Sequence, residues 1–193
     1  MQRTVRTFVA VEISSEVRSH ARQLIAKLSE TPAKVRWVEP ENLHLTLKFL
    51  GDVELLDMPA VCDAVSAAVA DLPPFDLMAR GAGAFPTLQR PRTVWIGFDE
   101  GTDDIVALHG AIEMRLAPLG FRREQRRFRP HLTIGRVRDC PPEAFADLAQ
   151  RLSAAAEFVG GSTDVNEVVV FSSELRREGP TYEPLGHAEL GGI

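Results

Sequence analysis

The chain is poor in the residues and patterns that build disulfide scaffolds, zinc sites or membrane spans. It has two cysteines among 193 residues, Cys62 and Cys140, and they show neither CxxC nor zinc-type spacing. No apolar run approaches the roughly 20 residues that a membrane span requires. The first residues do not form a secretory signal. We therefore expect a cytoplasmic protein with two inert thiols and no membrane contact.

Two further motif classes are missing. No glycine-rich loop of the kind that cradles ATP phosphates is present. The histidines show no His-x-x-x-His spacing and no adjacent carboxylate, which a zinc site would favour. We expect the protein to work without a metal or another cofactor.

The formal net charge of -5 argues against a protein that coats nucleic acid indiscriminately. Such binding depends on many Lys and Arg residues that neutralise phosphates. One stretch around His131 is nevertheless strongly basic. It is either a solvated loop or a local positive field for an anionic substrate. Its arginines are Arg122, Arg123, Arg126, Arg127, Arg129, Arg136 and Arg138.

Strand and helix patterns alternate along the chain, which has the length and apolar content for a substantial core. One domain over 1–193 is expected, and a pair of lobes that share a groove also fits. A turn-rich stretch over 85–92 suggests a long loop inside a hairpin. Strands are predicted over about 7–13, 43–50, 75–84, 93–97, 129–137, 166–171 and 182–189, and helices over about 15–29, 56–70, 103–119 and 142–157.

One short motif occurs twice. His44-Leu45-Thr46-Leu47 is repeated as His131-Leu132-Thr133-Ile134, near the middle of each half of the chain. From average residue usage, two such matches among five histidines arise by chance with a probability of about 10⁻⁵. The repeat therefore indicates a duplicated strand–helix unit, with one copy of the motif in each lobe.

Strand geometry gives this motif a chemical meaning. Side chains alternate between the two faces of a strand, so His44 and Thr46 share one face while leucines occupy the other. The same alternation places His131 with Thr133. If a pseudo-twofold axis relates the two units, two histidines and two threonines meet at one groove.

This set of side chains suits a phosphodiester. Hydrolysis of a cyclic phosphate requires one group that takes a proton from water, another that donates a proton to the leaving oxygen, and donors for the non-bridging oxygens. Two imidazoles with a pKa near 6.5 can do the first two tasks close to neutral pH. Two hydroxyls can do the third.

With these residues in place, the chain resembles the two-histidine phosphoesterases, and specifically the RNA 2′,3′-cyclic phosphodiesterases, also described as 2′-5′ RNA ligases. A lone His-x-Thr motif is weak evidence, whereas the pair with matching flanks is strong. The resemblance covers nearly the whole chain. Its matching segments are 8–11, 41–51, 92–97, 128–136, 173–175 and 179–182.

The resemblance implies a bilobal, pseudo-twofold α+β fold, with antiparallel sheets that face a central groove and helices outside. It implies that His44 donates a proton to the leaving 3′ oxygen and that His131 accepts a proton from water. The expected partner is RNA that ends in a 2′,3′-cyclic phosphate, and the product is a 2′-phosphate. In reverse, the same chemistry makes a 2′-5′ linkage without ATP. We expect a monomer.

The sequence provides weaker evidence for the residues that bind the substrate than for the two histidines. Phe49 and Arg136 each lie five residues after a motif histidine, where strict alternation turns them away from the groove. A bulge could turn them back, and an aromatic ring with a guanidinium can sandwich a nucleobase, a role that the resemblance favours. Without the resemblance, Phe49 is an ordinary core residue.

Four more residues are candidates for substrate contacts. Lys48 shares the predicted face of His44 and Thr46, where it meets backbone phosphate or forms a solvated strand end. Arg92, beside the hairpin loop, lines the groove or the outer surface. Arg129 comes from the arginine stretch. Tyr182, the one tyrosine, reaches the groove by analogy with the family or serves packing.

Two alternatives remain open at this stage. The groove could only bind RNA ends or a nucleotide, although arginine holds phosphate better than histidine does. The substrate could also be a small cyclic nucleotide or a 2′-5′ oligoadenylate.

Overall fold

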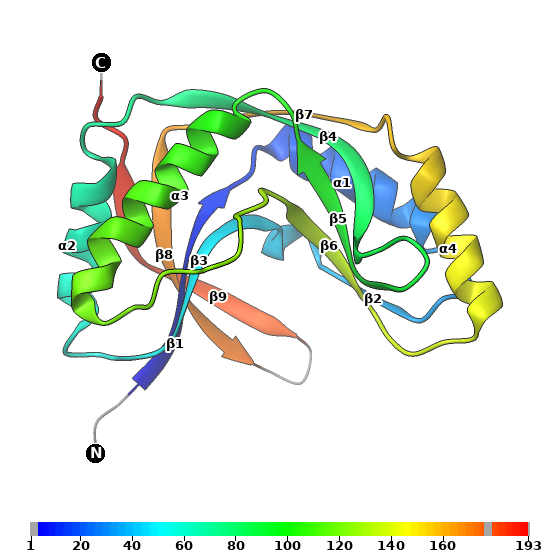
Figure 1. Ribbon diagram of the computed structural model, residues 1–193, viewed down its shortest axis with the longest axis horizontal. Coiled ribbons are helices and arrows are strands. Elements are labelled where there is room, and N and C mark those ends of the chain that lie inside the picture. Colours follow the sequence, from blue (N-terminus) through cyan, green and yellow to red (C-terminus); the bar gives the residue numbers. More distant parts are fainter. Residues whose placement is uncertain (1–3, 176–178, 193) are drawn as a thin grey trace.

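The computed structural model describes residues 4–175 and 179–192, and its strands form two antiparallel sheets (Figure 1). The four-stranded sheet has the order β3 (His44–Glu54), β1 (Thr4–Glu12), β8 (Glu167–Leu175) and β9 (Pro180–Glu189). The five-stranded sheet has the order β2 (Val35–Trp37), β6 (Leu132–Val137), β5 (Pro91–Phe98), β4 (Phe75–Pro86) and β7 (Val159–Val165).

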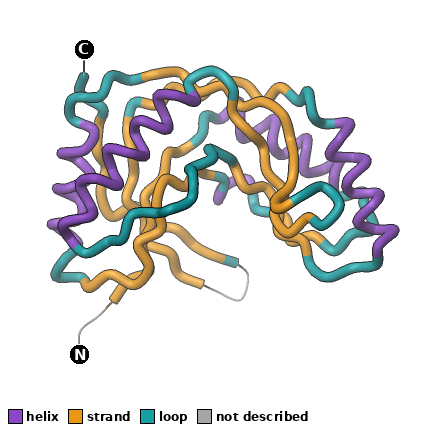
Figure 2. Tube along the Cα trace, in the orientation of Figure 1, coloured by secondary structure: helices purple, strands orange, loops and turns teal. Residues whose placement is uncertain are grey.

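The α-helices lie outside the sheets (Figure 2). Helices α2 (Met58–Val69) and α3 (Thr102–Leu116) pack on the four-stranded sheet. Helices α1 (Ser15–Leu28) and α4 (Pro142–Ala154) pack on the five-stranded sheet. Within the described ranges, no helix has both the length and the apolar character needed to cross a membrane.

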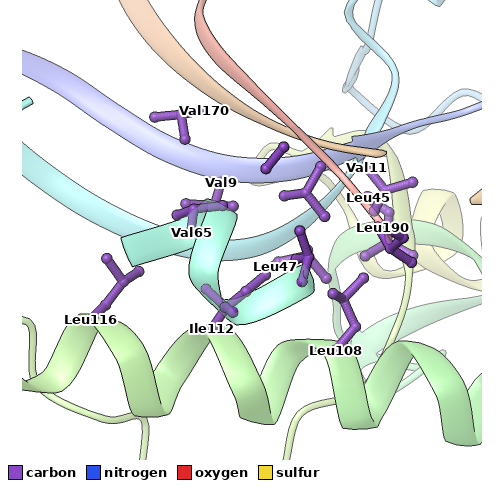
Figure 3. Close-up of a cluster of buried hydrophobic side chains, with 14 of the residues drawn as sticks. Val9, Val11, Leu45, Leu47, Val65, Leu108, Ile112, Leu116, Val170 and Leu190 are labelled. Carbon is purple, nitrogen blue, oxygen red and sulfur yellow. The ribbon is translucent and has the colours of Figure 1, made fainter. Parts of the chain in front are cut away.

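Each lobe has its own core, and each core lies between a sheet and its helices. In the lobe of the four-stranded sheet, Val9 and Leu47 pack against Ile112 of α3 (Figure 3). The alternate side chains of β1, such as Phe8, point to the opposite, inner face of that sheet, where they form a smaller aromatic cluster. The helices thus cover the outer faces of the two sheets and leave the inner faces without a helix.

The two lobes do not correspond to the two halves of the chain. After β1 the chain crosses to the other lobe for α1 and β2, returns for β3 and α2, and crosses again for β4 and β5. The last two strands, β8 and β9, return to the sheet that β1 and β3 began. The prediction of one motif in each lobe is confirmed, but each lobe collects segments from both halves.

A capped helix start shows how a crossing is fixed. The Ser14 hydroxyl oxygen accepts a hydrogen bond from the Val17 amide at 3.1 Å and so caps the helix. The same hydroxyl donates to the Ser162 carbonyl of β7 at 2.7 Å. One side chain therefore both begins α1 and ties it to the five-stranded sheet.

Several observed elements differ from the expectation, among them β7, the β4–β5 hairpin and β6. Strand β7 was not predicted, because Gly160 and Gly161 interrupt its apolar pattern. The hairpin loop expected over 85–92 shrinks to residues 87–90, since β4 and β5 extend further than their apolar cores. Strand β6 begins only at Leu132, so His131 directly precedes it.

Helix α3 provides a test of the packing. Ile112 is fully buried against β3 and α2, whereas Met114, two residues on, is 62% exposed. We expect Ile112→Ala to lower the free energy of unfolding by about 2–5 kcal/mol, because a buried side chain leaves a cavity. Met114→Ala, the control on the same helix, should change it by less than about 0.5 kcal/mol. Urea unfolding followed by circular dichroism measures both, and equal losses would contradict the packing.

Candidate active site

Both motif strands show the predicted alternation. In β3, Leu45 and Leu47 are buried beneath the helices while His44 and Thr46 are half-buried on the inner face. In β6, Leu132 and Ile134 are fully buried and Thr133 is half-buried.

The fold brings the two motif strands together. Strands β3 and β6 belong to different sheets, yet they are in direct contact. Figure 1 shows them at the middle of the molecule, between the two groups of helices. The histidine and threonine of each motif therefore face the same region, as the repeat predicts.

Each histidine is held by a backbone carbonyl two residues before it. The Nδ1–H group of His44 donates to the Asn42 carbonyl at 2.8 Å, and that of His131 donates to the Arg129 carbonyl at 2.7 Å. A carbonyl oxygen only accepts hydrogen bonds, so Nδ1 carries the hydrogen in both rings. In each histidine this leaves Nε2 as the nitrogen that exchanges a proton with a bound molecule.

The ring of His44 lies in an aromatic setting. Its centroid is 4.8 Å from that of Phe8 and 5.1 Å from that of Tyr182, which meets it edge-on. Burial lowers the pKa of His44, and the hydrogen bond to Asn42 offsets part of this shift. The imidazole of the unliganded protein is therefore neutral near pH 7.

His131 has a different aromatic neighbour. The ring of Phe85 lies 5.1 Å from it and perpendicular to it. Phe85 also contacts Trp95, which stands opposite Thr133 in the β5–β6 register. A Cβ atom at Gly83 would lie 2.5 Å from the indole of Trp95, so a glycine is required there for the indole to lie flat on the sheet.

The motif threonines have unengaged hydroxyls. Neither Thr46 nor Thr133 forms a side-chain hydrogen bond to any other residue in the described part of the chain. Both are half-buried on the inner faces. Two hydroxyl donors thus accompany the two Nε2 atoms.

A β-bulge follows the threonine in both strands. Thr46 and Lys48 pair with consecutive residues of β1, so Leu47 is the extra residue. In β6 the extra residue is Ile134, in the same position of the motif. A bulge reverses the alternation of the side chains beyond it. The two motifs are therefore alike in backbone geometry as well as in sequence.

The bulges turn Phe49 and Arg136 back to the inner faces, as the resemblance favours. Phe49 is 60% exposed, and its ring lies 6.0 Å from that of Phe8, the neighbour of His44. Arg136 is exposed and stands opposite Thr93 of β5. It lies close enough to Tyr182, on the other sheet, for its charge to act on that phenol.

The expectation that Lys48 shares the face of His44 is wrong, because the same bulge turns Lys48 outward. Its side chain is buried and forms an ion pair with Glu113 of α3 at 2.5 Å. It also donates to the Arg122 carbonyl at 2.9 Å, while the second oxygen of Glu113 accepts from the Glu124 amide. Lys48 and Glu113 therefore hold the loop that contains Arg122 and Glu124 against β3 and α3.

The arginines do not form one field around His131. Arg92 lines a hollow with Arg138 and Phe145 of α4, on the outer side of the five-stranded sheet, so its predicted place in the groove is wrong. The reason is alternation, since the inner position on β5 belongs to Thr93. Arg129 has an exposed side chain, and what reaches the site is its carbonyl.

Two residues near the site escaped the sequence reasoning. Asn42 orients His44 through its carbonyl, and its side-chain amide donates to the Pro180 carbonyl of β9 at 3.1 Å. Phe8 supports the ring of His44. The equal spacing of Asn42 and Arg129 from their histidines was a signal in the repeat that could have found the carbonyl contacts.

Potential metal ligands are not gathered in the described ranges. Within residues 4–175 and 179–192, no three His, Cys, Asp or Glu side chains come together in a way that could hold an ion. The residues that meet at the inner faces are two histidines, two threonines, aromatic rings and arginines.

Fold and site together define a two-lobed protein with one histidine–threonine pair on each lobe. The chain belongs to the 2′-5′ RNA ligase superfamily, whose model matches residues 17–177.

Curated relatives cover almost the whole chain. The RNA 2′,3′-cyclic phosphodiesterase of Methanothermobacter thermautotrophicus is 37% identical over 178 residues, which span 92% of this chain and 95% of that protein. The RNA 2′,3′-cyclic phosphodiesterase of Thermotoga maritima is 32% identical over 188 residues, which span 97% of each.

Solved structures share the fold. Escherichia coli LigT complexed with 3′-AMP superposes with a TM-score of 0.77 at 26% identity, over 97% of this chain and 99% of that one. A Thermus thermophilus protein reaches a TM-score of 0.81 at 24% identity, over 97% of this chain and 98% of that one, and shows likeness of fold alone.

The position of Lys48 generates a test. Lys48→Met leaves the buried Glu113 carboxylate without its cation, so we expect unfolding to become easier by about 3–5 kcal/mol. Replacing both partners, in Lys48→Met with Glu113→Leu, should recover most of that loss. Urea unfolding of the single and double variants measures it. A double variant as unstable as the single one would contradict the ion-pair role.

Proposed function

We propose that the protein hydrolyses the 2′,3′-cyclic phosphate at the end of an RNA strand to a 2′-phosphate, by acid–base catalysis with two histidines and without a metal. One observation carries the proposal: both imidazoles keep Nδ1 engaged by a carbonyl and leave Nε2 for proton transfer. The curated relatives named RNA 2′,3′-cyclic phosphodiesterase support the substrate.

The reaction needs two proton transfers in opposite directions. His131, with a neutral imidazole, accepts a proton at Nε2 from the water that attacks phosphorus. The bond from phosphorus to the ribose 3′ oxygen then breaks. His44, with a protonated imidazole, donates the proton that this oxygen needs. The products are a 2′-phosphate and a 3′-hydroxyl, and the protons balance.

Burial gives His44 the character of an acid. A lowered pKa makes the imidazolium a better proton donor but leaves it neutral in the empty protein. A phosphate anion beside Nε2 favours the charged form, so binding of substrate loads the proton that the leaving oxygen later takes. The assignment of the acid to His44 and the base to His131 follows the family resemblance, and the buried position of His44 supports it.

The two threonines complete the charge stabilisation. The hydroxyls of Thr46 and Thr133 have no partner in the described part of the chain and can donate to the non-bridging oxygens. Phe49 and Arg136, turned inward by the bulges, can hold the terminal base between ring and guanidinium. The edge-on ring of Tyr182 fixes the tilt of His44 and lines the same face.

The proposal extends to the whole chain. We take residues 1–193 as one catalytic domain with two lobes, because each lobe supplies one histidine and neither is contiguous in sequence. The protein acts as a monomer. In reverse, the same groups join a cyclic phosphate to a 5′-hydroxyl as a 2′-5′ linkage without ATP.

The direct test uses an RNA that ends in a 2′,3′-cyclic phosphate. We expect a 2′-phosphate product, formed equally well in the presence of a chelator. His44→Ala and His131→Ala should each reduce turnover by about 10²–10⁴-fold, and His20→Ala, on α1, should not. Chromatography of the RNA ends measures this. RNA that is bound but unchanged would show a recognition module instead.

The depressed pKa of His44 predicts proton uptake on binding. When cyclic-phosphate RNA binds to the His131→Ala protein at pH 7, we expect the complex to take up close to one proton per RNA molecule. His44 is neutral in the empty protein, and the bound anion favours its charged form. Calorimetry in two buffers with different ionisation enthalpies measures the uptake. The control is His131→Ala with His44→Gln, and equal uptake by both proteins would contradict the assignment.

A further inference from the structure

Three exposed arginines at the inner faces form no ion pair within the described part of the chain. Arg6 of β1, Arg36 of β2 and Arg136 of β6 are all exposed. None of them forms an ion pair or a side-chain hydrogen bond with any residue of the described ranges. Asp52 stands opposite Arg6 in the β1–β3 register, yet no ion pair joins them. Like charges held together without partners indicate a place for an anion.

The strand register puts these arginines on the groove side. Arg36 and Arg136 are directly paired across β2 and β6. Their neighbours Trp37 and Gly135 point the other way, since a Cβ atom at Gly135 would lie 2.8 Å from the indole of Trp37. Both guanidinium groups therefore leave the five-stranded sheet on its inner face.

Arg36 reaches the opposite lobe. Its Nη2 atom lies 3.7 Å from where a Cβ atom of Gly179 would stand, at the start of β9 in the four-stranded sheet. Tyr182, three residues further on, packs edge-on against Phe8 with ring centroids 5.0 Å apart. Arg6 shares the face of Phe8 by strand alternation. Arg6 and Arg36 thus approach Tyr182 from different lobes.

The electrostatic setting of Tyr182 supports this convergence. Burial raises the pKa of its hydroxyl, while the charges of Arg136, Arg6 and Arg36 act in the opposite direction. The phenol thus stays protonated, and its O–H group is a donor placed among three cations.

We propose that Arg36 and Arg6, with the Tyr182 hydroxyl between them, bind the phosphodiester that precedes the terminal nucleotide, so that the substrate is an RNA strand rather than a single nucleotide. This inference rests on the proposed hydrolysis at the two histidines. It answers the question of substrate size that the sequence left open.

The spacing along β6 fits one nucleotide. Arg136, with Arg36 beside it, follows Thr133 by three residues, of which Ile134 is the bulged one, so the two positions are separated by roughly 7 Å of strand. An arginine side chain and one extended nucleotide can bridge that separation. A mononucleotide that ends in the cyclic phosphate has no preceding phosphodiester to occupy this position.

The test compares two dinucleotides that end in the same 2′,3′-cyclic phosphate. One has a natural internal phosphodiester, and the other has a neutral methylphosphonate in that position. In the unaltered protein we expect kcat/KM to be about tenfold or more higher for the charged substrate, because a charge-assisted contact is lost in the other. In Arg36→Ala and in Arg6→Ala the two substrates should become equal within about twofold.

Matched variants separate this from a general charge effect. Arg115→Ala removes the same charge from the exposed face of α3 and should keep the full discrimination. Arg36→Lys should keep part of it, since lysine lacks the planar fork of donors. The salt dependence of kcat/KM for the charged substrate should become shallower by about 0.7 in Arg36→Ala, as for one lost single-strand phosphate contact.

The outcomes are distinct. Equal rates for both substrates in the unaltered protein, or the same preference in Arg36→Ala, Arg6→Ala and Arg115→Ala, would overturn the phosphate site while leaving the hydrolysis in place. No turnover of either dinucleotide by the unaltered protein would instead refute the proposed function.

Discussion

In each motif strand, one extra, unpaired residue follows the threonine. It lets one short strand point some side chains into the core and others to the inner face, in an order that plain alternation does not allow. Leu45, Leu47 and their counterparts in β6 must point outward to fill the cores beneath the helices, while His44 and Thr46 point inward. Without the bulges, the next side chains would continue that alternation and Phe49 and Arg136 would be lost to the outer face. The inner positions of Phe49 and Arg136 and the outward position of Lys48 depend on this reversal.

The residues just before the two motif strands fix which ring nitrogen of each histidine carries the hydrogen. A carbonyl behind each ring keeps the hydrogen on Nδ1, so two imidazoles of identical chemistry present the same nitrogen to a bound molecule. Their surroundings then distinguish them, since aromatic packing around His44 disfavours its charged form. An internal repeat therefore supplies two histidines with the same backbone contact, and their aromatic neighbours differ.

Much of this arrangement could be predicted from the sequence, and the misses have physical causes. The repeated motif predicted the faces of its residues, because side chains two positions apart on a strand point to the same face. Lys48 was misplaced since one extra residue in a ladder changes the face without any mark in composition. Strand β7 was missed because its glycines break the pattern. The position of Tyr182 of β9 beside His44 depends on strand pairing between distant segments, which periodicity does not encode.

The alternating path of the chain between the lobes has a consequence for how the protein tolerates damage. The sheet that carries the first histidine is completed by β8 and β9, the last two strands in the described part of the chain. A nascent or truncated chain that ends after β7 holds both histidines, yet it lacks half of that four-stranded sheet and the carbonyl of Pro180 that steadies Asn42. Such a fragment leaves β1 without its neighbour β8, and it leaves Asn42, whose carbonyl orients His44, without its contact to β9.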